Sequence, residues 1–254
     1  MISFKVLFGP GIRLMRQLRI ATKMSGMGLF LLVPLVLLLL TTYQHADADR
    51  RIATTELQGV SLARQISELI GQTQAHRGLT NRVLSGDAGS AAARDQARAA
   101  MADTLRRLDA TVADTRLFDA DSLWRERRAA LAALAEGRHA AQRQEAFAEH
   151  TNAVDSLRQM LMLVGERSGL VLDPEASTFF LMDIALERVV PLSETLGVTR
   201  GQGSTILVRG EMSNTERVQI LGRMNVLLTQ SSDLRHKFGA LERSGTPIPA
   251  GWKD

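Results

Sequence analysis

The strongest constraint in this sequence is an uncharged, mostly apolar run of twenty residues, Met24 to Tyr43, near the amino terminus. Its centre, residues 31–40, consists of leucine and valine with a single proline. As an α-helix rising about 1.5 Å per residue, the run would extend about 30 Å, which matches the hydrocarbon core of a bilayer. The sequence therefore predicts one transmembrane helix over residues 24–43.

The charges that flank this run predict its orientation. Five basic residues and no acidic residue precede it: Lys5, Arg13, Arg16, Arg19 and Lys23. Because cytoplasmic flanks carry the excess of Lys and Arg, we expect residues 1–23 in the cytoplasm and the rest on the far side of a bacterial inner membrane, in the periplasm. A cleaved signal peptide ending near Ala46-Asp47-Ala48 is the alternative, but the run is longer than such peptides need. We therefore predict a retained anchor.

The overall charge does not indicate a nucleic-acid partner. The chain has 31 basic and 27 acidic residues, a formal charge of +4. Without the five cations of the tail, 26 basic residues face 27 acidic ones, so the exported part is about neutral. Binding to a phosphate backbone requires a basic face, which this distribution does not supply.

Composition favours an all-α protein without enzymatic activity. The absence of cysteine excludes disulfide scaffolds, thiolate metal sites and cysteine nucleophiles. Only 4% of the residues are aromatic, which argues against a β-sandwich. The chain carries no phosphate-binding loop, nucleophile elbow or zinc-protease motif, and its five histidines lack ligand spacing. We expect no catalytic residues, no metal and no cofactor.

Helix caps and breakers divide residues 44–245 into about six helices, followed by an extended tail over 246–254. The first continues from the anchor to about Ser85, and the fifth should begin at an Asp173-Pro174 cap and kink at Pro191. The sixth begins with a capping box, Ser213 to Glu216, followed by a heptad seam ending at Leu241. The second, third and fourth are expected at about Ser90–Asp114, Asp121–Gly137 and Gln142–Val171. This pattern predicts an antiparallel helical bundle, with the long helices able to run through two stacked four-helix layers.

Three arginines are candidates for a ligand site. Arg77 and Arg188 fall at the centres of apolar stripes on the first and fifth helices, and Arg167 flanks the apolar stripe of the fourth. Burying a guanidinium lowers the free energy of unfolding by about 3 kcal/mol or more unless an anion or a carboxylate pairs with it. The head groups could therefore bind a small anionic ligand, or they could reach solvent or pair with carboxylates such as Glu166, Asp183 or Glu187.

Two motifs carry a family resemblance. Residues 74–80, Q-A-H-R-G-L-T, resemble the Q-x-E-R-G-L-S signature of nitrate- and nitrite-sensing helical domains, with His76 where that signature has glutamate. Residues 172–183 are similar to the L-D-P-x-x-x-S-Y-Y-L-M-D stretch of many exported sensor bundles, with Phe179 and Phe180 in place of the tyrosines. With the basic tail and the membrane run, residues 10–245 resemble the amino-terminal half of bacterial methyl-accepting chemotaxis proteins and related sensor kinases and diguanylate cyclases.

This resemblance implies a ligand-sensing periplasmic domain of a chemotaxis-type receptor. It makes Arg77 the best position for an anion contact, with nitrate, nitrite or a carboxylate as ligand, and it implies a homodimer. Such receptors continue through a second membrane helix into a HAMP linker and an output domain, so we expect this chain to be a fragment of a longer receptor. Two alternatives stay open: the sensor half of a histidine kinase or diguanylate cyclase, and a membrane-anchored helical module that docks a protein partner without a small ligand.

Overall fold

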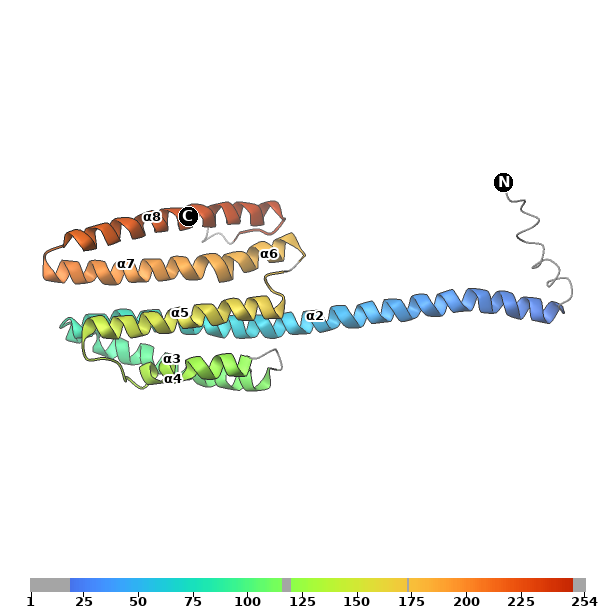
Figure 1. The fold of residues 1–254 in the computed structure, drawn as a ribbon, viewed down its shortest axis with the longest axis horizontal. Coiled ribbons are helices and arrows are strands. Elements are labelled where there is room, and N and C mark those ends of the chain that lie inside the picture. Colours follow the sequence, from blue (N-terminus) through green and yellow to red (C-terminus); the bar gives the residue numbers. More distant parts are fainter. Residues whose placement is uncertain (1–18, 116–119, 173, 249–254) are drawn as a thin grey trace. The chain divides into compact units, whose positions relative to one another are not determined.

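The computed structural model describes residues 19–115, 120–172 and 174–248, and within these ranges it contains helices and no strand. The prediction of an all-α fold is therefore confirmed (Figure 1). The α-helices are α2 (Ile20–Leu84), α3 (Ala91–Asp114), α4 (Ala120–Ala135), α5 (Arg143–Ser168), α6 (Ala176–Met182), α7 (Val190–Arg209) and α8 (Asn214–Arg243). A short 3₁₀ turn, η1 (Ala88–Ser90), precedes α3, and a π-helix, η2 (Asp183–Val189), joins α6 to α7.

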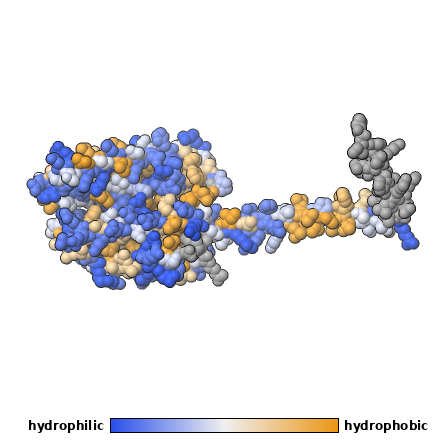
Figure 2. All heavy atoms as spheres, viewed as in Figure 1, coloured by the Kyte–Doolittle hydropathy of each residue, from blue (hydrophilic) through white to orange (hydrophobic). Residues whose placement is uncertain are grey.

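The chain divides into two compact units, of which the first ends at Ala53. In the described part of this unit, α2 passes through Pro34 without interruption and carries the apolar run. Its large apolar side chains are exposed, and Figure 2 shows them gathered along this part of the helix. Among the described residues, α2 is the one helix long and apolar enough to cross a membrane. The transmembrane assignment of residues 24–43 stays a prediction, and most of the basic tail, residues 1–18, lies outside the described residues.

The second unit, residues 54–254, is organised around one hydrophobic core. The carboxyl-terminal half of α2 packs with α3, α4 and α5, and each helix contributes residues at steps of three and four, the spacing of one helix face. Fully buried members of this core are Leu62, Ile66, Leu69, Met101, Leu108, Val154, Leu157 and Met160. The four helices therefore form a bundle that buries its apolar faces against one another.

The segment from α6 to α8 lies beside this bundle and contributes little to its core. α7 and α8 pack against each other as an antiparallel hairpin (Figure 1). Only Leu186 and Val190 of this segment join the core cluster. Along the predicted heptad seam of α8, Leu241 is buried, whereas Met224 is 50% exposed. The hairpin is thus held to the bundle by few apolar contacts.

The predicted helix ends are correct to within about three residues, with one error at the fifth helix. The capping box is confirmed: the Glu216 amide donates to Ser213 Oγ at 3.2 Å, and the Ser213 amide donates to the Glu216 carboxylate at 2.9 Å. The predicted N-cap at Asp173 is wrong, because α6 begins at Ala176, two residues after Pro174, with Glu175 as its N-cap. The first helical bond runs from the Phe179 amide to the Glu175 carbonyl, at 2.9 Å. Asp173 itself lies outside the described residues.

The disruption expected at Pro191 takes the form of the π-helix η2 just before it. Proline has no amide hydrogen to donate, and its ring crowds the carbonyl four residues earlier, here that of Glu187. A π-helical turn, which bonds at a spacing of five residues, accommodates this conflict without ending the helix. The fifth predicted helix is consequently three consecutive segments, α6, η2 and α7.

Two glycines of α2 offer a test of this packing. A Cβ at Gly59 would lie 2.3 Å from the Cβ of Ser168 in α5, whereas a Cβ at Gly71 would meet nothing within 4 Å. We expect Gly59→Ala to lower the free energy of unfolding by about 1–3 kcal/mol through overpacking. Gly71→Ala should raise it by about 1 kcal/mol, because alanine favours a helix interior. Denaturant titration of the full chain in detergent, followed by circular dichroism, measures both, and changes of the same sign would contradict the close α2–α5 contact.

Candidate functional site

Arg77 is a charged side chain in the interior of the helical domain. It is 2% exposed, and it points from α2 toward α5 and α7. Its Nη1 donates to Glu194 Oε1 at 2.6 Å and its Nη2 to Glu194 Oε2 at 3.0 Å, a bidentate pair. Nη1 also donates to the Thr151 hydroxyl at 2.9 Å, and the guanidinium lies 4.9 Å from the centre of the Phe147 ring. The buried positive charge is therefore fully compensated within the chain.

Glu194 is the residue that supplies this compensation. It stands in the first turn and a half of α7, is 6% exposed, and accepts a further hydrogen bond from Gln74 Nε2 at 2.9 Å. Glu194, which is 117 residues away from Arg77, was not among the carboxylates predicted as partners from the sequence. One signal was present: Glu194 follows Val190 by four residues and precedes Gly197 by three, so it is an acidic residue on an otherwise uncharged helix face.

A cavity of about 360 Å³ opens beside this ion pair, between α2 and α7. Three arginines contribute to its walls, Arg77, Arg82 and Arg200. Its other lining residues include Gln74, Gly78, Gly197 and Ser204. Arg82 pairs with Asp87 at 2.8 Å, whereas the described residues give Arg200 no ion pair.

Glycines allow the two helices to approach around these guanidinium groups. A Cβ at Gly197 would lie 3.0 Å from Arg77 Nη2, and one at Gly78 would lie 3.4 Å from Arg200 Nη2. Side chains at these positions would fill the space between the cations. The arrangement is therefore a small, cation-lined cavity of the kind that accepts a small anion.

The structure does not bring the three predicted arginines together. Arg188, in η2, is half-buried and pairs with Asp183 at 3.2 Å and with Asp233 of α8 at 2.7 Å. Asp183 also pairs with Lys237 at 2.8 Å, so this cluster balances two cations with two carboxylates and ties η2 to α8. Arg167 lies in the last turn of α5 and is exposed. Arg82 and Arg200, which the sequence analysis did not single out, are the cations that share the cavity with Arg77.

A buried pair of histidines lies next to Arg77 in the sequence. His76 Nδ1 is 2.9 Å from His150 Nε2, and His150 Nδ1 is 2.6 Å from the Ala146 carbonyl. Since a carbonyl only accepts, His150 carries its hydrogen on Nδ1, and its Nε2 accepts from His76 Nδ1. Burial, followed by the positive charge that His150 and His139 would carry, lowers the pKa of His76 to about 4, and burial likewise lowers the pKa of His150. Both rings are therefore neutral at pH 7.

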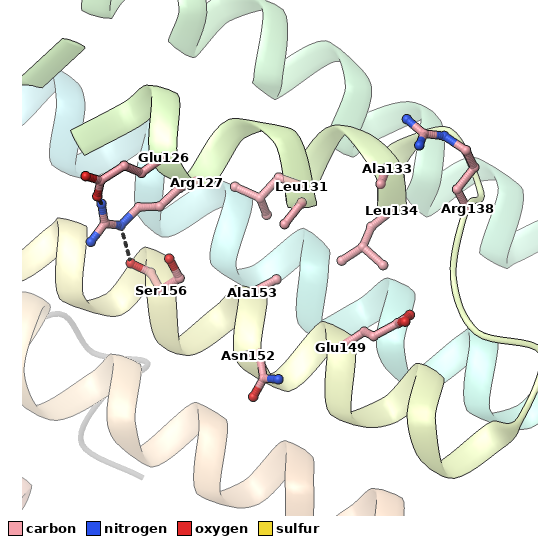
Figure 3. Close-up of a pocket in the computed structure, with 11 residues that line it drawn as sticks. Glu126, Arg127, Leu131, Ala133, Leu134, Arg138, Glu149, Asn152, Ala153 and Ser156 are labelled. Carbon is pink, nitrogen blue, oxygen red and sulfur yellow. Dashed lines mark hydrogen bonds and ion pairs between the residues drawn. The ribbon is translucent and has the colours of Figure 1, made fainter. Parts of the chain in front are cut away.

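A second cavity, of about 380 Å³, lies between α4 and α5. Leu131, Leu134 and Ala153 line its middle in Figure 3, with charged residues at its two ends. One of these, Arg127, donates to the Ser156 carbonyl at 3.0 Å and to the Leu123 carbonyl at 2.8 Å. Because the middle of this cavity is apolar, its ends carry the acids Glu126 and Glu149, and the Arg127 guanidinium is already engaged, the cavity is less suited to an anion than the one at Arg77.

Comparisons with known proteins identify a fold and no family. No protein-family model matches the chain, and no curated protein matches it. A solved structure, that of the NasR transcription antiterminator, is similar with a TM-score of 0.56 and 22% sequence identity. The similarity covers 75% of this chain and 54% of that one, so it spans about half the length of the antiterminator. At this identity the likeness shows a shared helical fold.

The neutral histidine pair predicts acid sensitivity. Because the pKa of His76 is about 4 in the folded chain and about 6.5 when unfolded, the unfolded state binds more protons between these values. The contribution of neutral His76 to the free energy of unfolding is therefore fully present above pH 6.5. It is lost as the pH falls toward 4, by up to about 3 kcal/mol. Unfolding free energies of the full chain at pH 7 and pH 4.5 measure this loss.

His76→Gln should remove part of this dependence, and substitution of the exposed His236 by Gln should not. The same pH dependence in both variants would show that the buried pair does not cause the loss.

Proposed function

We propose that residues 44–245 form the periplasmic sensor domain of a membrane-anchored receptor, and that the domain responds to a small anion bound beside Arg77. The observation that carries this proposal is the cavity between α2 and α7, which is lined by one buried arginine, Arg77, and two exposed ones, Arg82 and Arg200. Arg200 lines this cavity and has no ion-pair partner among the described residues. An anion in the cavity would supply one.

The ligand class follows from the geometry of these groups. A guanidinium presents two parallel N–H donors, which match the oxygens of a planar anion such as nitrate, nitrite or a small carboxylate. The motif around Arg77 favours the same class, because it resembles the signature of nitrate- and nitrite-sensing helical domains. Nitrate is therefore the first ligand to test.

The remaining parts of the proposal rest on the sequence. The apolar segment of α2 and the basic residues before it support an inner-membrane anchor with the bundle in the periplasm. The motif at residues 172–183 supports a sensor of the chemotaxis type, and a sensor kinase or cyclase would carry the same domain. Pairing of two copies finds support in α8, where Val218, Leu221 and Leu228 are each more than half exposed on one helix face.

The antiterminator suggests another activity, but the charge distribution gives it less support. Transcription antitermination is the function in that protein's name, and the similarity reaches this chain through the fold. Recognition of nucleic acid would need an unpaired basic face. In the described helices, arginines on α3 and α4 instead pair with neighbouring acids, as Arg107 does with Glu68 and Arg128 with Asp109. The small-anion sensor is the better proposal.

Removal of Arg200 tests the proposed site without disturbing the buried pair. We expect the full chain in detergent to bind nitrate, and Arg200→Ala to weaken binding about tenfold or more, because one charge-assisted hydrogen bond contributes about 1.5–3 kcal/mol. Isothermal titration calorimetry gives the affinities. Arg217→Ala, an exposed cation of α8 outside the cavity, should leave them unchanged. If nitrate, nitrite and acetate all fail to bind at millimolar concentration, the anion sensor is excluded and the protein-docking alternative gains weight.

The absence of cysteine makes the membrane orientation simple to test. A cysteine replacing the exposed Glu211 should react with a membrane-impermeant maleimide added to spheroplasts, because we expect the helical domain to lie outside the inner membrane. A cysteine replacing Ser3 in the basic tail should react only after the cells are lysed. Protection of position 211 in intact spheroplasts would reverse the proposed orientation.

A further inference from the structure

The carboxylate of Glu194 occupies the face of Arg77 that an external anion would use. Two of the guanidinium nitrogens donate to its two oxygens, at 2.6 and 3.0 Å, and the pair is buried. We propose that the Glu194 carboxylate takes the place of the ligand when no ligand is bound. The incoming anion displaces this carboxylate from Arg77, and the exchange releases α7 from α2. The inference rests on the proposed function and specifies how the same site is regulated.

Exchange follows from the hydrogen-bond donors of Arg77. Both terminal nitrogens of its guanidinium already donate to the carboxylate of Glu194, so an anion that binds these two donors must take the place of that carboxylate. The added cations of the cavity, Arg82 and Arg200, line its wall and do not contact Glu194. The anion and Glu194 therefore compete for the same donors, and the cavity cations favour the anion.

The geometry of Glu194 also defines what can replace it. A carboxylate is planar, and its two oxygens match the two parallel donors of the guanidinium. Nitrate and acetate share this shape, whereas sulfate and phosphate are tetrahedral and larger. Exchange should accordingly distinguish planar anions from tetrahedral ones.

Loss of the Glu194 contact would free the start of α7. The hydrogen bonds that join α2 to α7 run from Arg77 and Gln74 to Glu194, with a longer one of 3.4 Å from Gln74 to Ser193. Elsewhere along α7 only Val190 and Ile206 are buried. The preceding π-helix η2 provides a turn whose bonding can rearrange by one residue. The contact that the anion breaks is thus a main attachment of a weakly buried helix.

Glu194→Gln tests the exchange, because glutamine keeps the shape of the side chain and removes its charge. In the full chain in detergent, we expect nitrate to bind at least about tenfold more tightly to this variant than to the wild type, since its charged competitor is gone. Glu211→Gln, an exposed carboxylate at the α7–α8 link, should leave the affinity unchanged. Calorimetric titration with nitrate, acetate and sulfate gives the affinities and the shape preference.

The outcomes separate the two proposals. Nitrate binding to the wild type with an unchanged affinity in Glu194→Gln would overturn the exchange and leave the anion site standing. No binding of any anion to either protein would overturn the proposed function.

A second measurement does not depend on the folding of that variant. Spin labels on cysteines that replace Gly71 in α2 and Leu207 in α7, both exposed positions, report the separation of the two helices. Saturating nitrate should shift the distance distribution of the doubly labelled chain, and sulfate should not. An unchanged distribution at a nitrate concentration that saturates binding would overturn the release of α7.

Discussion

The Arg77–Glu194 pair is the interaction on which the arrangement of this domain depends. Neither charge could stay buried alone, because removing one member of such a pair typically costs about 3–5 kcal/mol. The two residues come from α2 and α7, so the pairing fixes the hairpin to the four-helix core at one defined position. Apolar contacts alone would not set this register, since the segment from α6 to α8 contributes only Leu186 and Val190 to the core cluster.

The two parts of the domain are therefore held by different forces. α2, α3, α4 and α5 bury leucine, methionine and valine side chains in a continuous cluster, and this part carries most of the hydrophobic stabilisation. The segment from α6 to α8 relies on ion pairs, including the cluster of Arg188, Asp183 and Lys237. Elements with few buried apolar contacts open at lower free energy than the core does. Movement within this domain is consequently expected at the hairpin.

Sequence reasoning predicted the helices well and the site only in part. Helix ends are encoded locally, as the capping box at Ser213 illustrates, and apolar periodicity identified Arg77 as a misplaced charge on a core face. Its partner could not be identified in the same way, because Glu194 and Arg77 meet only through the tertiary packing of two distant helices. The pairing of His76 with His150 was missed for the same reason, and Arg200 looked like any other solvent-facing cation. The predicted cap at Asp173-Pro174 differs from the observed start of α6, which has Glu175 as its N-cap.

The π-helix before α7 has a geometric consequence for the whole segment after it. A helix turns by about 100° per residue, so one extra residue accommodated in a wide turn rotates every later side chain by about that angle relative to a regular helix. The phase of α7, and hence the direction in which Glu194 faces, is set by η2. If residues 183–189 formed an ordinary α-helix instead, the Glu194 side chain would point in a different direction around the helix axis. Arg77 would then have no counterion within the chain.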